Sequence, residues 1–319
     1  MKIYLKLSFL LLLPFASFSQ KIDNMASFRD ISAERYFRFS YDNDYFDSSD
    51  RDYTQGYSFE LVSPKLKKNP VNHLLSTPAG TQYKYGIAIE HIGFTPNNIK
   101  SPEIQIGDRP FAAAIMLKSF AIATDTLRKS RLISALSIGI IGPGAFGQEM
   151  QSEIHRATGN DIPQGWQNQI KNDVVLNYEI GYERQLLHYR RLISLQANGG
   201  VKVGSLFTNA SVGFSAMFGI VNSPFSNINK KSRLQMYFYS QPLVSVIGYD
   251  ATLQGGLFND KSSYKITSKA VERFTAQHNV GVIVQIKALY FEYSRANTTR
   301  QFETGRSYGW GGVKVGFKF

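Results

Sequence analysis

The stretch VVLNYEIGYE, residues 174–183, alternates apolar and polar side chains with a period of two. Apolar and aromatic side chains fall on one face of this stretch, namely Val174, Leu176, Tyr178, Ile180 and Tyr182. The opposite face carries Asn177, Glu179, Gly181 and Glu183. Successive side chains of a β-strand point to opposite faces, so this pattern predicts a strand between an apolar and a polar environment.

The last residues of the chain, GVKVGFKF (312–319), show the same alternation and end on the aromatic residue Phe319. A soluble β-sandwich also alternates, so alternation alone leaves two architectures open. The apolar faces are rich in Tyr and Phe near the strand ends, and the polar faces carry charges and Gly. Aromatic girdles outside and a polar lumen inside are typical of transmembrane β-barrels.

Twelve candidate strands can be delimited, near residues 34–42, 53–63, 83–92, 110–121, 131–141, 173–185, 191–203, 207–221, 234–247, 270–286, 288–297 and 308–319. A bacterial barrel that closes on itself has an even number of strands. We therefore predict an all-β fold, a transmembrane antiparallel β-barrel of about twelve strands. The boundaries are least certain at 248–275.

The N-terminus has the layout of a cleavable secretory signal. Lys2 and Lys6 precede a short apolar run, Leu7 to Pro14, which is followed by small residues. We expect residues 1–19 to be the signal peptide and residues 20–319 to form a single outer-membrane barrel domain. The apolar run is too short to span a bilayer, which takes roughly 20 such residues.

The charge and composition exclude several partners and chemistries. Lys and Arg number 36 against 24 Asp and Glu, a net charge of +12, and there is no Cys. The absence of Cys excludes disulfides, thiolate metal sites and a Cys nucleophile. The basic residues are scattered, and a secreted chain rarely meets nucleic acid, so we expect no nucleic-acid partner. Anionic lipid headgroups match this charge better.

One segment, GPGAFGQEMQSEIHRATGNDIPQGWQNQIKN (142–172), does not fit the strand pattern. It is too long for a hairpin turn and too polar for hydrocarbon, which indicates a functional extracellular loop. Its core, Gln148 to Ala157, predicts a short helix with Gln148, Ser152 and His155 on one stripe. The imidazole of His155 suits general-base chemistry near neutral pH.

Three further clusters carry polar side chains. Asn43 and Asp44 close the first strand in YDNDYF, and Asp47, Asp50 and Asp52 follow. So many carboxylates together suggest either a solvated turn or a site for a hard cation such as calcium. Thr54 enters the second strand in DRDYTQG, and Arg109 lies in GDRPFA, where it could pair with a phosphate or with Asp108.

The order of YDNDYF, DRDYTQG, GDRPFA and IGIIGPGAFGQEMQSEIHR…PQGWQNQI resembles the lipid A deacylase family, outer-membrane enzymes that remove the 3′-linked acyloxyacyl chain from lipid A. The likeness is dense over about 35–185 and looser afterwards. It implies a twelve-stranded, calcium-dependent barrel in the bacterial outer membrane.

The resemblance also implies roles for particular residues. Asn43 and Asp44 match the family's essential pair, Thr54 its hydroxyl residue, His155 its catalytic base and Lys100 its site lysine. Calcium would be held by Asp44 and by Asp161, which stands where the family has Glu. His155 would take a proton from the water that attacks the ester. Lys100 and Arg109 would bind the phosphates of lipid A.

Two alternatives remain open at this stage. An outer-membrane phospholipase A is also a calcium-using barrel, but it relies on a Ser nucleophile placed in a strand, whereas Ser152 lies in the predicted helix. A porin or structural barrel would need no chemistry and would conduct ions. In all three cases we expect a membrane-embedded protein, and we expect a monomer. For the deacylase, the expected partner is its substrate, lipid A or lipopolysaccharide.

Overall fold

Twelve antiparallel strands close into a barrel in chain order, with β1 paired to β12. The structure is a computed structural model that describes residues 23–44, 52–78, 82–226 and 234–319, so the expected signal peptide lies outside the described residues. The strands are β1 Tyr36–Asn43, β2 Asp52–Val62, β3 Gln82–Thr95, β4 Ala112–Asp125, β5 Ser130–Ile141, β6 Asp173–Tyr189, β7 Ile193–Gly204, β8 Phe207–Ile220, β9 Leu234–Asp250, β10 Phe274–Ile286, β11 Leu289–Thr298 and β12 Tyr308–Lys318. The predicted fold class is confirmed.

Short helices occupy the connections. They are η1 Ser27–Arg29, η3 Pro64–Lys68, η4 Pro70–Leu74, η5 Pro143–Ala145, α1 Gly147–Thr158, η6 Trp166–Asn168 and α2 Ala251–Gln254. Helix α1 confirms the helix predicted within the long loop. The strand predicted from residue 270 begins only at Phe274, because residues 251–273 form a loop that contains α2.

The outer wall of the barrel is apolar and the lumen is polar, as the alternation predicts. In β6, Val174, Leu176 and Ile180 are exposed on the outside, whereas Glu183 is buried in the lumen. In the lumen, charges lie in pairs, since an isolated charge away from water is costly. Such pairs are Arg38–Glu60 at 2.7 Å, Lys118–Glu90 at 2.8 Å and Lys314–Asp42 at 3.4 Å. No helix in the described part of the chain is long and apolar enough to cross a membrane.

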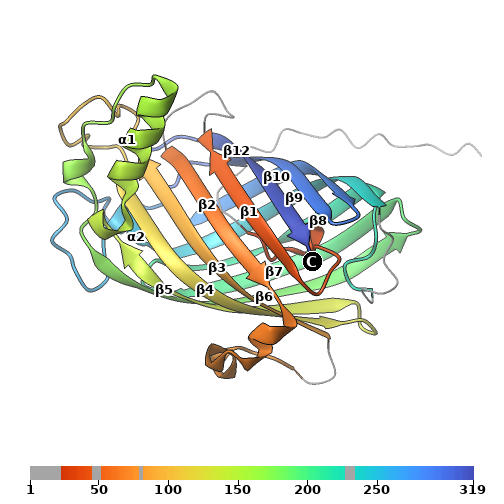
Figure 1. The fold of residues 1–319 in the computed structure, drawn as a ribbon. Helices are drawn as coiled ribbons and strands as arrows, with labels where there is room; N and C mark the ends of the chain where they lie inside the picture. The colour runs from red at the N-terminus through yellow and green to blue at the C-terminus, as the bar shows by residue number, and fades with distance from the viewer. Residues whose placement is uncertain (1–22, 45–51, 79–81, 227–233) are drawn as a thin grey trace, which may run out of the picture.

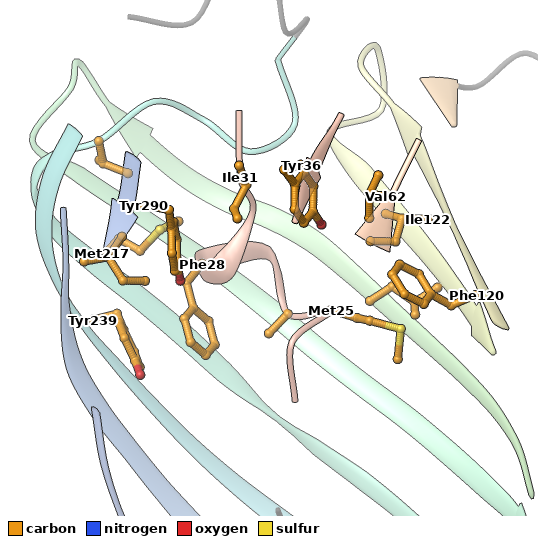
Figure 2. Packing of buried hydrophobic residues seen from close by; sticks show 14 of the residues in the cluster. Met25, Phe28, Ile31, Tyr36, Val62, Phe120, Ile122, Met217, Tyr239 and Tyr290 are labelled. Atoms are coloured by element: carbon orange, nitrogen blue, oxygen red, sulfur yellow. The ribbon is translucent and has the colours of Figure 1, made fainter. Parts of the chain in front are cut away.

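The N-terminal segment before β1 lies inside the barrel, which the sequence did not predict. Met25, Phe28 and Ile31 pack in the lumen against inward-facing side chains of the wall (Figure 2). Phe28 stacks on Tyr239 with ring centroids 4.2 Å apart, and Arg29 pairs with Glu292 at 2.8 Å. The segment therefore plugs the end of the lumen from which β1 starts.

A second layer closes the lumen at its other end. Tyr53, Phe94 and Trp310 are buried there, with the ring of Tyr53 5.3 Å from Phe94 and 5.1 Å from Trp310. Between the two layers lies a cavity lined in part by the Lys118–Glu90 pair. The two apolar layers thus obstruct the lumen at both ends.

We expect the intact protein to carry no steady ionic current in planar bilayers, because apolar layers block both ends of the lumen. The measurement is single-channel recording after insertion of the refolded barrel, with a known porin as the positive control. Reproducible open steps of porin size would contradict the closed lumen and favour the porin alternative.

Candidate active site on the outer wall

The ends of β1 and β2 present polar side chains on the outside of the barrel. In β1, Arg38 and Asp42 face the lumen, where they bind Glu60 and Lys314, so the alternate residues Tyr41 and Asn43 face outward. The amide of Asn43 donates to the hydroxyl of Tyr41 at 3.0 Å and to the carbonyl oxygen of Thr54 at 2.7 Å. These bonds hold Asn43 against the neighbouring strand.

A β-bulge places Thr54 on the same outer face. The pairing of β2 with β3 shifts register between Tyr53 and Gln55, so Thr54 is the extra residue. Tyr53 points into the lumen, whereas the Thr54 hydroxyl accepts a hydrogen bond from the hydroxyl of Thr95 at 3.3 Å. Because Phe94 is in the lumen cluster, its neighbour Thr95 faces outward.

Helix α1 lies over this outer face, at the end of the barrel opposite the C-terminus (Figure 1). It is held by a cluster in which the rings of Phe111 and Trp166 lie 5.0 Å apart, with Ala113 beside them. A Cβ at Gly147, the first residue of α1, would lie only 2.4 Å from the Cβ of Ala113. Glycine at position 147 therefore permits the close approach of α1 to the wall.

Gln151 joins the helix to the wall, and sequence reasoning missed it. Its amide nitrogen donates to the Thr54 hydroxyl at 3.2 Å, and its amide oxygen accepts from the Trp166 indole at 2.8 Å. Gln148, Ser152 and His155 share one stripe of α1, as predicted, but Gln148 lies in the first turn and is exposed. The buried residues of α1 are Gly147, Gln151, Ser152 and His155.

His155 lies one helical turn beyond Gln151 on the same buried face and is 6% exposed. Its Nδ1 lies 2.5 Å from the carbonyl oxygen of Asp161, so Nδ1 carries the proton and donates it. The lone pair then lies on Nε2, which is the arrangement a general base needs. The loop after α1 thus fixes both the orientation and the tautomer of this ring.

Lys100 and Asp161 meet beside His155. The ammonium of Lys100 lies 2.6 Å from the Asp161 carboxylate, and the two side chains are 66% and 63% exposed. The structure therefore brings together a cation from the β3–β4 loop and the residue whose carbonyl holds His155. The Asp161 carboxylate is engaged by Lys100, which competes with its predicted role as a calcium ligand.

The structure also bears on the expected metal. Asp44, at the end of β1, is 2% exposed, and a carboxylate buried so deeply needs a compensating charge or hydrogen bonds. No group of three or more His, Asp or Glu side chains suited to a metal occurs among the described residues, and Asp47 and Asp50 lie outside them. The carboxylate of Asp44 is of the chemical type that calcium prefers, and calcium also accepts backbone carbonyls and water as ligands.

Arg109 lies away from this outer site. Its guanidinium is 4.1 Å from the ring centroid of Phe94 in the lumen cluster, and it contacts Gln301 and Thr252 at 3.4 Å. The side chain is 1% exposed. Among the described contacts, the Arg109 guanidinium does not pair with the Asp108 carboxylate either. That carboxylate accepts hydrogen bonds from the backbone N–H groups of Arg109 and Asn97.

His91 is a second residue that sequence reasoning passed over. It is fully buried on the outer side of β3, its Nε2 lies 2.9 Å from the carbonyl oxygen of Ala145, and its ring stacks on Tyr57 at 4.9 Å. It fastens the start of the long loop to the wall. Nothing in the sequence around His91 signals this contact, because Ala145 is 54 residues away.

Replacing Gln151 by alanine should lower the activity of this site on the order of a hundredfold, because the loss of both bonds lets α1 and His155 shift relative to Thr54. The measurement is the rate of substrate turnover by the refolded barrel. Gln148→Ala is the matched control, since Gln148 is the same residue type in the same helix but is exposed. Equal activities of the two variants would contradict the positioning role of Gln151.

The closed barrel, its apolar outer wall and a polar site on that wall define an outer-membrane β-barrel protein whose site faces the membrane. Residues 5–319 match the family model described as outer membrane protein LpxR, and the chain belongs to this family. The resemblance to the lipid A deacylase family is thereby confirmed, as is the location in the bacterial outer membrane.

Solved structures agree on the fold. LpxR from Salmonella typhimurium matches with a TM-score of 0.73 and 21% identity, covering 89% of this chain and 100% of that chain. The β-domain of the Bordetella autotransporter BrkA matches with a TM-score of 0.48 and 7% identity, covering 91% and 100%, a likeness too weak to add to the argument. No curated protein matches the sequence significantly.

Proposed function

We propose that this protein is a lipid A 3′-O-deacylase, a hydrolase that removes the 3′-linked acyloxyacyl chain of lipid A, with His155 as the general base. The observation that carries the proposal is the position of His155 on the buried face of α1, with Nδ1 held by the Asp161 carbonyl and Gln151 bound to Thr54 one turn away. This arrangement supports the proposal because it fixes the ring of His155 on the face of α1 that packs toward the lipid-facing wall.

The reaction would proceed by direct attack of water on the ester. Nε2 of His155 takes a proton from water as its oxygen bonds to the carbonyl carbon, and the carbonyl oxygen becomes an oxyanion. The imidazolium then returns the proton to the sugar oxygen as the ester C–O bond breaks. The products are the released acyloxyacyl chain, as a carboxylic acid that keeps its secondary ester, and a sugar hydroxyl.

Neighbouring side chains have supporting parts in this proposal. Asn43, fixed against Thr54 by its 2.7 Å bond, orients the end of β1 next to Asp44. Asp44 and nearby oxygen atoms would hold calcium, which when bound supplies positive charge that stabilises an oxyanion. Lys100 is exposed and cationic, so it suits a phosphate of the substrate better than the buried Arg109.

A site on the outer wall also suits the physical state of the substrate. The acyl chains of lipid A stay in hydrocarbon, and the apolar outer surface below the site offers them the same environment as the membrane. The side chains there include Leu117 and Ile138, which are 50% and 57% exposed. The substrate therefore reaches the site without leaving its leaflet.

The test is mass spectrometry of lipid A from a host that lacks this activity, with and without the expressed protein. We expect lipid A to lose the mass of one acyloxyacyl unit, while the phospholipids keep their acyl chains. Unchanged lipid A together with accumulating lysophospholipid would replace this proposal by a phospholipase A. No change in either lipid would favour a barrel without chemistry.

A further inference from the structure

The end of the barrel that carries the start of β1 and the end of β12 is its periplasmic end. β1 starts there, β12 ends there, and the two longest loops, 142–172 and 251–273, lie at the opposite end (Figure 1). Outer-membrane barrels have short periplasmic turns and longer extracellular loops. The tight turns 126–129, 190–192 and 287–288 therefore face the inner, phospholipid leaflet of the outer membrane.

Each of these three tight turns holds a cation in a backbone conformation that suits glycine. Lys129, Arg190 and Lys287 have φ angles of 53°, 51° and 51°. Five non-glycine residues have positive φ in the described part of the chain, and these cations are three of them. Hairpin turns strongly favour Gly, Asn or Asp at such positions. Strained backbone that is retained at several equivalent places points to a function for the side chains.

More cations lie beside the strained ones. Arg128, Arg191 and Lys318 complete a set that we call the basic rim: Arg128, Lys129, Arg190, Arg191, Lys287 and Lys318. Negative charge is sparse at the basic rim. In the described part of the chain it consists of Asp125, which contacts Arg128 at 3.4 Å, of Glu34 and of the carboxylate of Phe319. The extracellular loops, by contrast, carry both signs, as in the Lys100–Asp161 and Arg300–Glu272 pairs.

The basic rim also lies directly next to exposed apolar side chains. Leu127 is 91% exposed, Tyr189 is 52% exposed and Phe319 is 68% exposed. Lys287, Lys318 and Phe319 line one open groove together. A cation beside an exposed apolar group matches a lipid, which presents an anionic headgroup next to its acyl chains.

From the strained turns, the one-sided charge and the adjoining apolar surface, we propose that the basic rim binds the headgroups of anionic phospholipids in the periplasmic leaflet. This surface is separate from the outer-wall site under α1, and it would hold the barrel at a fixed depth and tilt in the membrane. Its partner is the anionic phosphodiester headgroup of a bilayer phospholipid, and it does not depend on the proposed hydrolytic activity.

The test compares the binding of two spin-labelled lipids to the refolded full-length barrel in phosphatidylcholine bilayers. Electron spin resonance gives the fraction of spin-labelled phosphatidylglycerol, and of spin-labelled phosphatidylcholine, that is immobilised at the protein surface. We expect a preference for phosphatidylglycerol on the order of fivefold at low salt. It should largely vanish at about 1 M salt, where the screening length is about 3 Å.

The decisive variant combines Lys129→Gly, Arg190→Gly and Lys287→Gly. It removes three charges and relieves three strained turns, so the barrel should keep or gain stability. The preference for phosphatidylglycerol over phosphatidylcholine should fall toward a ratio of one. The matched control combines Lys261→Gln, Lys265→Gln and Lys269→Gln, which removes the same charge from exposed positions of the extracellular loop. This control should keep the preference.

Two outcomes would overturn the proposal: an unchanged lipid preference in the glycine variant, or an equal loss in the extracellular control. An unchanged lipid preference accompanied by weaker co-sedimentation of the glycine variant with purified peptidoglycan would assign the basic rim to the cell wall. If the glycine variant does not refold, the variant Lys129→Asn, Arg190→Asn, Lys287→Asn provides the same test, because asparagine removes the charge and tolerates a positive φ.

Discussion

Replacement of His155 by alanine is expected to lower the rate of lipid A deacylation by a factor of about 10² to 10⁴, the range that a positioned general base contributes. The barrel should stay folded, because His155 packs in the loop helix and not in the strand ladder. Lipid A mass spectra measure the activity. The heat-modifiable mobility of the barrel in gel electrophoresis measures folding.

Two controls make this result specific. His73→Ala replaces an exposed histidine in η4, at the opposite end of the barrel, and should leave the activity unchanged. Ser152→Ala removes the one hydroxyl on the buried face of α1 and should also keep most of the activity, because the proposed nucleophile is water. Near-normal deacylation by His155→Ala would remove this residue from the catalytic role, and an inactive Ser152→Ala would favour a serine nucleophile.

Removal of divalent cations is expected to abolish deacylation, and calcium should restore it better than magnesium. Asp44 directly follows the last residue of β1, and calcium tolerates a flexible, irregular set of oxygen ligands, whereas magnesium demands near-ideal octahedral geometry. The measurement is the rate of deacylation by the refolded enzyme in chelator, followed by titration with each ion. Full activity in chelator would exclude the metal from the mechanism.

Asp44→Asn locates the metal. The substitution keeps the shape of the side chain and removes one negative charge, so we expect the calcium concentration for half-maximal activity to rise about tenfold or more, equivalent to about 1.4 kcal/mol of binding free energy. Asp161→Asn is the informative partner variant. Because Asp161 is exposed and bound by Lys100, we expect it to change the calcium requirement less than Asp44→Asn. An unchanged requirement in Asp44→Asn would place the ligands elsewhere.

The outer-wall position of the site explains several features of the chain together. The bulge at Thr54, the glycine at Gly147 and the buried His91 each bring the loop helix closer to the wall or hold its loop there. None of these features is needed by a barrel that only spans a membrane. They hold polar side chains of the loop helix against polar side chains of the outer wall.

The strands could be predicted from the sequence because each one separates lipid from a polar lumen. That division imposes the period-two pattern on every strand, including Val313 to Phe319 at the C-terminus. Helix α1 could be predicted because its polar residues interrupt that pattern over 142–172. The end of β10 nearest the extracellular loop was predicted too early, because residues 251–273 carry no clear periodicity.

The site was only partly predictable. Asn43, Thr54 and His155 were singled out by the resemblance to the lipid A deacylase family, and the structure brings them to one outer face. Gln151 was missed because the sequence of a helix alone does not show which of two adjacent stripes will face the barrel wall. The internal plug of Met25, Phe28 and Ile31 was missed because a short segment before the first strand has no period of its own.

The sequence by itself determined the barrel class, its approximate strand number and the family, since these follow from local alternation and from motifs that are contiguous in the chain. Tertiary structure decided that the candidate site lies on the outer face of the barrel wall and not in the lumen. The outward turn of Thr54 depends on a bulge against β3, and the aim of His155 depends on helix docking through Trp166 and Phe111. Such contacts join residues distant in sequence, so no local pattern records them.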